Sequence, residues 1–288
     1  MFVDSVIGFL VVNRNSDLPY LSIMSAIKNS DSDIFIGFID ESDVLDLPTN
    51  ERISYVKLDP TVVGFEYRSQ KYKDFSSLEF YRIVQLKWQL LQELIDLNYS
   101  YIVYSDFDIV WLQNPIPEIA KTLDAFPGIH LLIQSFTTEP SQTRLCMGFA
   151  VFRKSSVSKD FLISAKELHS NLFLTNPLVG DDDVVTRLYG DLGQPSWIRE
   201  LPQATFPVGS MLNLFSKKNS FPGLSAPNPY IFHANYVVGL KNKRILMYII
   251  LRRFKQIPLS GTHFSFLILI ILKRLKYFVI NQKKSILD

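Results

Sequence analysis

Apolar runs of strand length alternate with helix-length segments along the first 105 residues of the chain. The strand-like runs are residues 6–12, 33–39, 53–58 and 101–105, and the helix-like segments are residues 18–28 and 76–97. The first run is apolar almost throughout, which is typical of a strand buried on both faces. Strands that alternate with helices favour a largely parallel sheet. The pattern therefore predicts an α/β domain with helices on both faces of its sheet.

The second half of the chain is less regular. Short strands are expected at residues 130–136 and 147–152, and helices at residues 157–170 and 182–189. Residues 193–231 are rich in Pro, Gly, Ser and Asn, a composition that predicts long loops over a site.

The composition indicates one globular domain with a substantial core. Of the 288 residues, 47% are apolar and 20% are charged. The single cysteine, Cys146, has no internal disulfide partner, which fits a reducing compartment. The apolar N-terminal run carries Asp4 where an export signal has basic residues, so we interpret it as a first strand.

The basic residues are concentrated at the C-terminal end. Residues 241–288 hold eleven Lys and Arg and one acid, a net charge of +10, whereas residues 1–240 carry a net charge of −8. A nucleic-acid-binding protein carries its basic face on the folded body, so nucleic acid is not expected as a partner. We expect a folded domain at residues 1–240 and a basic helical appendage at residues 241–288.

The appendage contains two apolar runs, residues 245–251 and 264–272. Each is shorter than the roughly 20 residues that span a bilayer. Two interpretations remain open. The runs form helices that lie on an anionic membrane surface through residues 245–288, or they pack on the core with solvated basic faces.

Two aspartates, Asp106 and Asp108, interrupt an apolar stretch. Two neighbouring carboxylates in apolar surroundings repel each other and lose their hydration, and a divalent cation such as Mg²⁺ or Mn²⁺ relieves both costs. We expect the spacing to aim both side chains to one side of an extended segment. The same spacing occurs at residues 31/33 and 181/183, but only Asp106 and Asp108 follow a strand-like run and precede a turn at Pro115. Open α/β sheets bind ligands at this end of their strands.

Later segments offer further candidates. His233 ends an apolar stretch and is either a structural histidine or a third metal ligand, in which case the mixed donor set favours Mn²⁺ over Mg²⁺. Lys241 is placed to neutralise a phosphate. The acids at 181–183 suit the positive end of a helix. Gly148 marks either a bulge or a close approach of substrate.

These motifs together resemble a known family. The segment YSDFDIVWLQNP, residues 104–115, resembles the metal-binding motif of nucleotide-sugar glycosyltransferases of the type A fold. It is most similar to the nucleotide-diphospho-sugar transferases, which include plant xylosyl- and arabinosyltransferases. MGFAVFRKS, GDDDVV and HANYVVGLK fall in the order of that family's later blocks. The resemblance covers residues 75–243 and implies a type A-like, Rossmann-like, mostly parallel sheet flanked by helices.

The resemblance also implies roles for matching positions. Asp108 is expected to bind the metal directly, and Asp106 to contact the metal or the ribose and sugar of the donor. His233 is expected as the third protein ligand and Lys241 as a diphosphate ligand.

Five further residues are implied less directly. Asp181 and Asp182 lie where relatives carry an Asp-Gln pair beside the transferred sugar, and the aspartate at 182 departs from that pattern. Arg82 and Lys87 are expected to face the donor. Asn13 is expected to contact the nucleotide.

The expected function is metal-dependent transfer, with retention of configuration, of a sugar from a nucleoside-diphosphate sugar to a glycan, lipid-linked or protein acceptor. If the product is inverted, the candidate base lies among residues 181–183. The expected location is the cytoplasm, including the cytoplasmic face of a membrane. Two alternatives are a phosphatase of the haloacid dehalogenase type that uses Asp106 and Asp108, and an inactive sugar-nucleotide-binding module.

Overall fold

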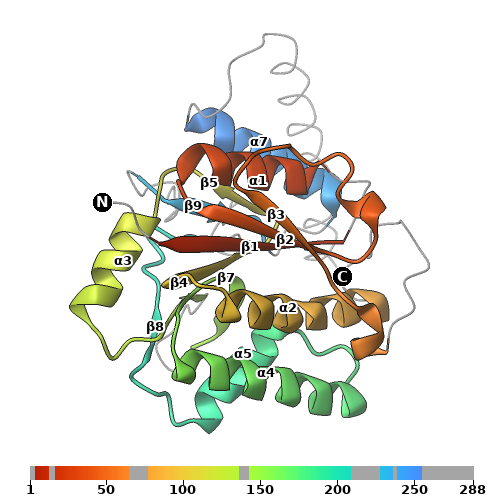
Figure 1. The fold of residues 1–288 in the computed structure, drawn as a ribbon, viewed down its shortest axis with the longest axis vertical. Helices are drawn as coiled ribbons and strands as arrows, with labels where there is room; N and C mark the ends of the chain where they lie inside the picture. The colour runs from red at the N-terminus through yellow and green to blue at the C-terminus, as the bar shows by residue number, and fades with distance from the viewer. Residues whose placement is uncertain are drawn as a thin grey trace, which may run out of the picture.

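A computed structural model describes residues 4–12, 17–64, 77–135, 143–208, 228–235 and 239–254. Its centre is a seven-stranded sheet of order β3-β2-β1-β4-β7-β6-β8 (Figure 1). The strands are β1 (Ser5–Val11), β2 (Asp33–Phe38), β3 (Ile53–Lys57), β4 (Tyr101–Ser105), β6 (Leu131–Ser135), β7 (Leu145–Arg153) and β8 (Ile198–Glu200). Within this sheet, β7 alone runs opposite to its neighbours β4 and β6, which confirms the mostly parallel sheet expected from the sequence.

Helices cover both faces of the sheet. They are α1 (Leu18–Asn29), α2 (Leu78–Asp96), α3 (Ile116–Ala125), α4 (Ser156–Thr175), α5 (Asp181–Asp191) and α7 (Leu240–Arg253), with short 3₁₀ turns η1 (Glu41–Asp43) and η2 (Pro60–Val63). In Figure 1, α1 and α7 lie on one side of the sheet and α2, α4 and α5 on the other.

The strand β1 shows why its sequence is apolar after Ser5. It lies between β2 and β4, and all seven of its residues are buried. Ile7 and Phe9 belong to the hydrophobic cluster on the α1 side, whereas Val6 and Leu10 belong to the cluster on the α2 side. Because both faces are covered, each successive side chain needs to be apolar. The interpretation of the N-terminal run as a strand is confirmed.

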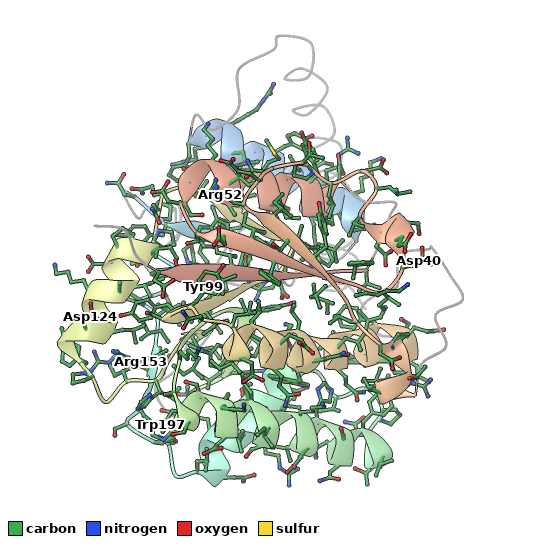
Figure 2. The ribbon with its side chains drawn as sticks, viewed as in Figure 1. Asp40, Arg52, Tyr99, Asp124, Arg153 and Trp197 are labelled. Carbon is green, nitrogen blue, oxygen red and sulfur yellow. The ribbon has the colours of Figure 1, made fainter. Side chains whose placement is uncertain are left out.

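The amino end of β4 is closed by polar contacts. The Arg153 guanidinium, at the end of β7, donates to the backbone oxygens of Leu123 and Ile129 and lies 6.0 Å from the centre of the Tyr101 ring. The Tyr101 hydroxyl donates to Asp124 at 2.5 Å. Figure 2 shows Asp124 and Arg153 at this edge. These contacts fix α3 to the sheet and leave the opposite end of β4 for the aspartates.

A second, two-stranded antiparallel sheet joins β5 (Ile109–Trp111) to β9 (Ile231–His233). The helices α1 and α7 pack on this sheet. The apolar run at 245–251 lies in α7, where Leu246, Met247, Ile250 and Leu251 are buried. This run therefore packs on the core, one of the two arrangements expected from the sequence. The run at 264–272 lies outside the described residues, and the boundary at 240/241 stays a prediction.

Two further observations bear on the expected organisation. Residues 198–200, expected to be loop, form β8, because this segment pairs in parallel with β6 at the sheet edge. No helix within the described ranges has both the length and the apolar character needed to cross a bilayer.

Candidate functional site

The Asp-x-Asp segment is a turn between the two sheets. The strand β4 ends at Ser105 and β5 begins at Ile109, and the Ile109 N–H donates to the Asp106 backbone oxygen at 3.2 Å. The Asp106 N–H donates to the Gly148 oxygen at 2.7 Å. The extended conformation expected here is therefore wrong, because the chain must turn to pass from one sheet to the other. The turn nevertheless brings both carboxylates to one place, at the carboxyl end of β4.

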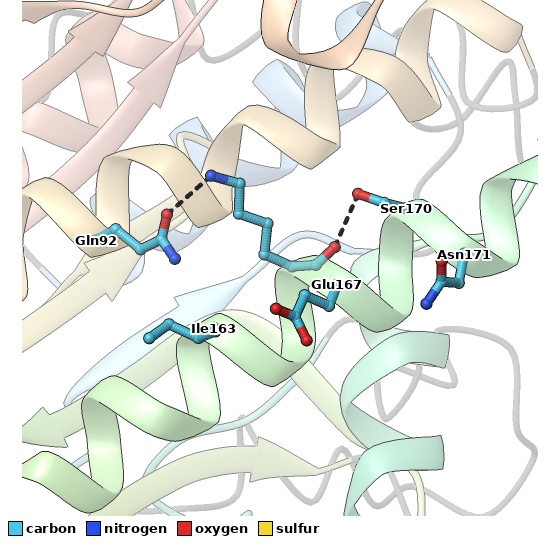
Figure 3. Close-up of a pocket in the computed structure, with 6 residues that line it drawn as sticks. Gln92, Ile163, Glu167, Ser170 and Asn171 are labelled. Carbon is cyan, nitrogen blue, oxygen red and sulfur yellow. Dashed lines mark hydrogen bonds between the residues drawn. The ribbon is translucent and has the colours of Figure 1, made fainter.

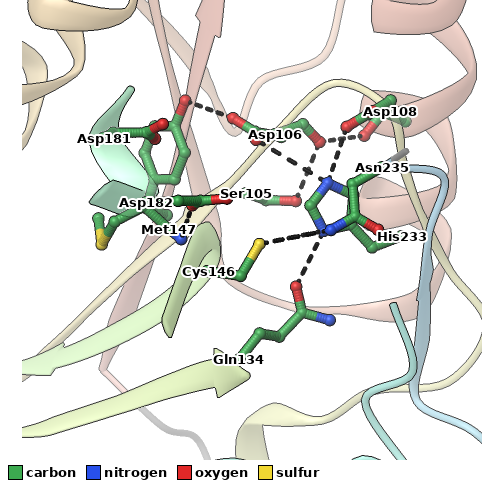
Figure 4. Close-up of polar contacts among 12 residues, drawn as sticks. Ser105, Asp106, Asp108, Gln134, Cys146, Met147, Asp181, Asp182, His233 and Asn235 are labelled. Carbon is green, nitrogen blue, oxygen red and sulfur yellow. Dashed lines mark hydrogen bonds and ion pairs between the residues drawn. The ribbon is translucent and has the colours of Figure 1, made fainter. Parts of the chain in front are cut away.

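His233 completes a group of three potential metal ligands. It is the last residue of β9 and pairs with Ile109, directly after the turn. One ligand atom from each of Asp106, Asp108 and His233 lies within 4.8 Å of the other two. Figure 4 shows the imidazole facing both carboxylates, with Nε2 3.1 Å from Asp108 Oδ1 and 3.9 Å from Asp106 Oδ2. Two carboxylates and one imidazole are a donor set that fits Mn²⁺ or Mg²⁺.

Gly148 makes room for this imidazole. A Cβ atom at position 148 would lie 2.0 Å from His233 Cε1, far closer than any van der Waals contact. The sequence offered two roles for Gly148, a bulge or a place for substrate. The pairing of β6 with β7 does shift its register between Ile133 and Gln134. The space beside Gly148 holds the ring of His233.

Lys87 contacts both the Asp-x-Asp turn and the acidic start of α5. It lies on α2, is 3% exposed, and its Nζ lies 3.2 Å from Asp106 Oδ1 and donates to Asp181. Burial alone would lower the pKa of Lys87, but the attraction of Asp106 and Asp181 raises it well above its usual value. The Tyr104 hydroxyl donates to the same Asp106 oxygen at 2.9 Å. Lys87 therefore stays charged, and its side chain lies in the lining of the cleft described below. Its contact with a donor stays a prediction.

The two metal-motif aspartates differ electrostatically. Burial would raise the pKa of Asp108, but the charge of Lys243 and the contact with His233 lower it well below its usual range. Burial raises the pKa of Asp106, partly offset by Lys87, and Asp108 raises it further. Asp108 is therefore the more firmly ionised of the two.

The lysine that reaches Asp108 is Lys243, whose Nζ donates to Asp108 Oδ2. The sequence pointed to Lys241, which lies exposed in the first turn of α7. Two residues along a helix correspond to about 200° of rotation, so Lys241 and Lys243 lie on opposite faces. Lys241 as a diphosphate ligand stays a prediction.

The three acids at the start of α5 have three different surroundings. Asp181 is bound to Lys87. Asp182 accepts a hydrogen bond from the Met147 N–H at 2.7 Å, and burial, with Asp181 beside it, raises its pKa to about 8. Asp183 accepts from the Gly180 N–H and from Arg144 near the surface. Asp181 is thus directed toward the motif, and Asp182 is directed toward β7.

A cleft adjoins these residues at the carboxyl ends of β1 and β4, where open α/β sheets bind ligands. Its lining combines apolar and polar side chains: Leu10, Val12, Phe80, Ile83, Val84, Lys87, Tyr104, Asp106, Phe107, Asp108, Asp181 and Lys243. Arg82 is not part of this lining and donates to the Gly64 oxygen at 2.8 Å. Asn13 lies outside the described residues.

A second hollow lies between α2 and α4 (Figure 3). Lys166 Nζ donates to Gln92 across the two helices at 3.0 Å, and the Ser170 hydroxyl donates to the Lys166 backbone oxygen. None of the candidate residues within the described part of the chain lines this hollow. Its polar contacts join two helices and suggest no chemistry.

The chain is similar in sequence to known proteins. The chain is 25% identical over 185 residues to UDP-D-xylose:L-fucose alpha-1,3-D-xylosyltransferase MGP4 of Arabidopsis thaliana, a match that covers 61% of this chain and 50% of that protein. It is 24% identical over 183 residues to UDP-D-xylose:L-fucose alpha-1,3-D-xylosyltransferase 3 of the same plant, covering 59% and 46%. The chain spans about half the length of these relatives.

Solved structures show the same fold. Mouse xyloside xylosyltransferase 1 matches with a TM-score of 0.52 at 12% identity, over 83% of this chain and 100% of that one. The galactosyltransferase LgtC matches with a TM-score of 0.56 at 10% identity, over 85% and 95%. The expected type A glycosyltransferase fold is confirmed. The model of the nucleotide-diphospho-sugar transferase family matches residues 44–247, and the chain belongs to that family.

Proposed function

We propose that this protein is a metal-dependent glycosyltransferase that moves a sugar from a nucleoside-diphosphate sugar to a glycan, lipid-linked or protein acceptor. The observation that carries the proposal is the convergence of Asp106, Asp108 and His233 at the edge of the cleft. Family membership supports the choice of donor class.

The charges of the site suit a diphosphate bound through a cation. Three carboxylates, from Asp106, Asp108 and Asp181, face two ammonium groups, from Lys87 and Lys243. A divalent cation held by Asp106, Asp108 and His233 would neutralise negative charge on the diphosphate as the sugar–phosphate bond breaks. Lys243 lies beside Asp108 and would donate to a diphosphate oxygen in the same place. We propose Mn²⁺ first, because one of the three ligands is a nitrogen.

The remaining parts of the cleft suggest how the donor lies. The apolar lining residues at the end of β1 and the start of α2 suit the nucleoside. Asp181 lies in the cleft next to Lys87 and suits a sugar hydroxyl. Asp182 faces away, toward the Met147 N–H. We propose transfer with retention, in which none of the residues at 181–183 acts as a base toward the acceptor.

A panel of nucleotide sugars tests the proposal, beginning with UDP-xylose because the Arabidopsis relatives are named for it. We expect Mn²⁺-dependent hydrolysis or transfer of at least one donor, lost in Asp108→Ala. Hydrolysis of a simple phosphate ester that depends on Asp106 would favour the phosphatase. Thermal stabilisation by Mn²⁺ and a nucleoside diphosphate, with no turnover of any donor, would favour the inactive module.

We further propose that the protein associates with the cytoplasmic face of a membrane through its basic C-terminal residues. The charge of that segment supports the proposal. Because α7 packs on the core, the deletion that tests it begins at residue 255. We expect the truncated protein to lose sedimentation with anionic vesicles and to keep donor hydrolysis. Unchanged sedimentation would contradict membrane association.

A further inference from the structure

Gln134 is a fully buried polar residue at the end of β6, directly beside the proposed metal site. Its side chain is 0% exposed, and its Oε1 lies 3.0 Å from Nδ1 of His233. Figure 4 shows the Gln134 amide on the side of the imidazole away from Asp106 and Asp108. A buried polar group at a sheet position needs hydrogen-bond partners, and this one finds one in the ring.

The surroundings fix which way the amide points. Gln134 Nε2 donates to the backbone oxygens of Phe206 at 3.1 Å and Pro207 at 3.5 Å. Carbonyl oxygens only accept hydrogen bonds, so the NH₂ group must face them and the amide oxygen must face the ring. An amide oxygen also only accepts, and His233 Nδ1 must therefore carry a proton.

The backbone is shaped to make this contact. The pairing of β6 with β7 is regular up to Ile133, which lies opposite Ala150, and then shifts so that Gln134 lies opposite Cys146. The residues skipped by this shift include Gly148, whose missing side chain leaves space for the ring. A bulge of this kind re-aims a side chain. Here it directs Gln134 and admits His233.

We propose that Gln134 is a positioning residue that holds His233 in the tautomer with its proton on Nδ1, so that the Nε2 lone pair faces Asp106 and Asp108. The inference rests on the metal site of the proposed function. Histidine ligands are commonly held in this way by a second hydrogen-bonded group. Cys146 is the other neighbour of Nδ1, but its sulfur lies 3.8 Å away and is a weaker acceptor.

The tautomer can be measured directly. The chain has four histidines, and ¹⁵N–¹H correlation of their side chains in the presence of Mg²⁺ and UDP distinguishes protonated from unprotonated ring nitrogens. His169 is an internal reference of the opposite kind, since its Nδ1 accepts from Trp88 and its Nε2 donates to the Val179 oxygen. We expect a proton on Nδ1 and none on Nε2 of His233, assigned by its absence in His233→Ala. A proton on Nε2 alone would overturn the inference.

Metal affinity provides the second readout. We expect Gln134→Met to weaken binding of Mn²⁺, measured calorimetrically with UDP present, by about 10–100-fold. Gln134→Glu keeps an acceptor for Nδ1 but loses the donor to the Phe206 and Pro207 oxygens, so we expect it to bind Mn²⁺ more tightly than Gln134→Met does. Two controls remove neighbouring groups: Cys146→Ala removes the other neighbour of Nδ1, and Gln203→Met removes an amide that donates to Ser135 on the same strand. Both controls should stay within about threefold of the wild type.

These measurements distinguish the role of Gln134 from the existence of the metal site. If the wild type binds Mn²⁺ and Gln134→Met binds it equally well, the role of Gln134 is overturned and the metal site stands. If the wild type binds no Mn²⁺ in the presence of UDP, the metal site is overturned and the role of Gln134 with it.

Discussion

Two buried histidines of this protein, His169 and His233, have almost the same exposure and opposite surroundings. They are 0% and 2% exposed. His169 lies between two neutral partners, the Trp88 indole N–H at 2.8 Å and the Val179 oxygen at 3.1 Å, and burial lowers its pKa. The Nδ1 atom of His233 has neutral neighbours, Gln134 and the more distant Cys146 sulfur, whereas its Nε2 atom faces two carboxylates.

The difference shows what separates a structural histidine from a candidate ligand. Both nitrogens of His169 are satisfied by neutral groups, so the ring joins α2, α4 and the segment before α5 and needs nothing further. Nε2 of His233 faces an excess of negative charge, which a cation relieves. Burial alone does not distinguish the two residues, and the charge of the partners does.

The largest effect is expected at His233. His233→Ala should lower Mn²⁺-dependent donor turnover by on the order of 10²–10³, the usual loss when one electrostatic contributor to catalysis is removed. The measurement is kcat/KM for the best donor of the nucleotide-sugar panel. Retained activity in a folded His233→Ala protein would place His233 with His169 as a structural residue.

At His169 we expect a loss of stability instead. His169→Leu leaves the Trp88 N–H and the Val179 oxygen without their partner, which should lower the free energy of unfolding by about 2–4 kcal/mol. Urea unfolding monitored by Trp fluorescence measures this change. Activity per folded molecule should stay within about threefold, and a loss as large as that of His233→Ala would contradict the comparison.

A smaller effect is expected for the lysines of α7. Lys243→Met removes a charged donor beside Asp108, which corresponds to about 10–100-fold in kcat/KM. Lys241→Met is the matched control from the exposed face of the same helix turn, and we expect less than threefold. A larger loss for Lys241→Met would support Lys241, the residue expected from the sequence, as the diphosphate ligand.

The smallest expected effect is a pH dependence of stability that arises from Asp182. Like His169, Asp182 has a neutral hydrogen-bond partner, the Met147 N–H. Its folded pKa of about 8 lies above its ordinary value of 3.8, so the native state retains a proton that the unfolded chain releases. Stability should therefore fall as pH rises from about 4 to about 8, and then level off. The Asp182→Asn variant has no carboxyl group at this position, so its unfolding free energy should not show this fall with pH. We expect its unfolding free energy, relative to the wild type, to rise by ~1 kcal/mol or more between pH 5 and 8.5.

Asp183→Asn is the control for this measurement, because Asp183 is half exposed beside Arg144. Its difference from the wild type should not vary over the same pH range. Metal-free protein is needed for both variants, since a bound cation would favour the ionised carboxylates. A wild-type stability that rises between pH 5 and 8.5 relative to Asp182→Asn would contradict the raised pKa.

The regular part of the fold could be predicted from the sequence because its signals are local. The buried parallel strands β1, β2 and β4 are long enough for an apolar pattern to be visible, and the helix α2 has Ser77 as its N-cap, with its hydroxyl accepting from the Phe80 N–H. Strands of three residues, such as β5, β8 and β9, are too short to show a period. Their pairing depends on contacts between segments far apart in the chain.

The site could be predicted only in part for the same reason. Asp106 and Asp108 carry a motif, His233 was a candidate from its place after an apolar stretch, and the family resemblance added Lys87. Gln134 has no sequence signal, because a single glutamine in an apolar strand does not indicate what it contacts. The choice between Lys241 and Lys243 depends on where α7 begins, which sets the face that each residue occupies.

The absence of a side chain at position 148 links two distant segments of the chain. Any Cβ at this position would collide with the ring of His233. An alanine at 148 should therefore displace the imidazole and abolish activity, although Gly148 is not itself a proposed ligand. A smaller residue at 233 would relieve the collision. The double variant Gly148→Ala/His233→Ala should therefore be more stable than Gly148→Ala alone, while remaining inactive. Amino-acid substitutions at positions 148 and 233 should therefore be coupled in evolution. A homologue without the histidine tolerates a larger residue in place of the glycine, whereas a homologue with the histidine does not.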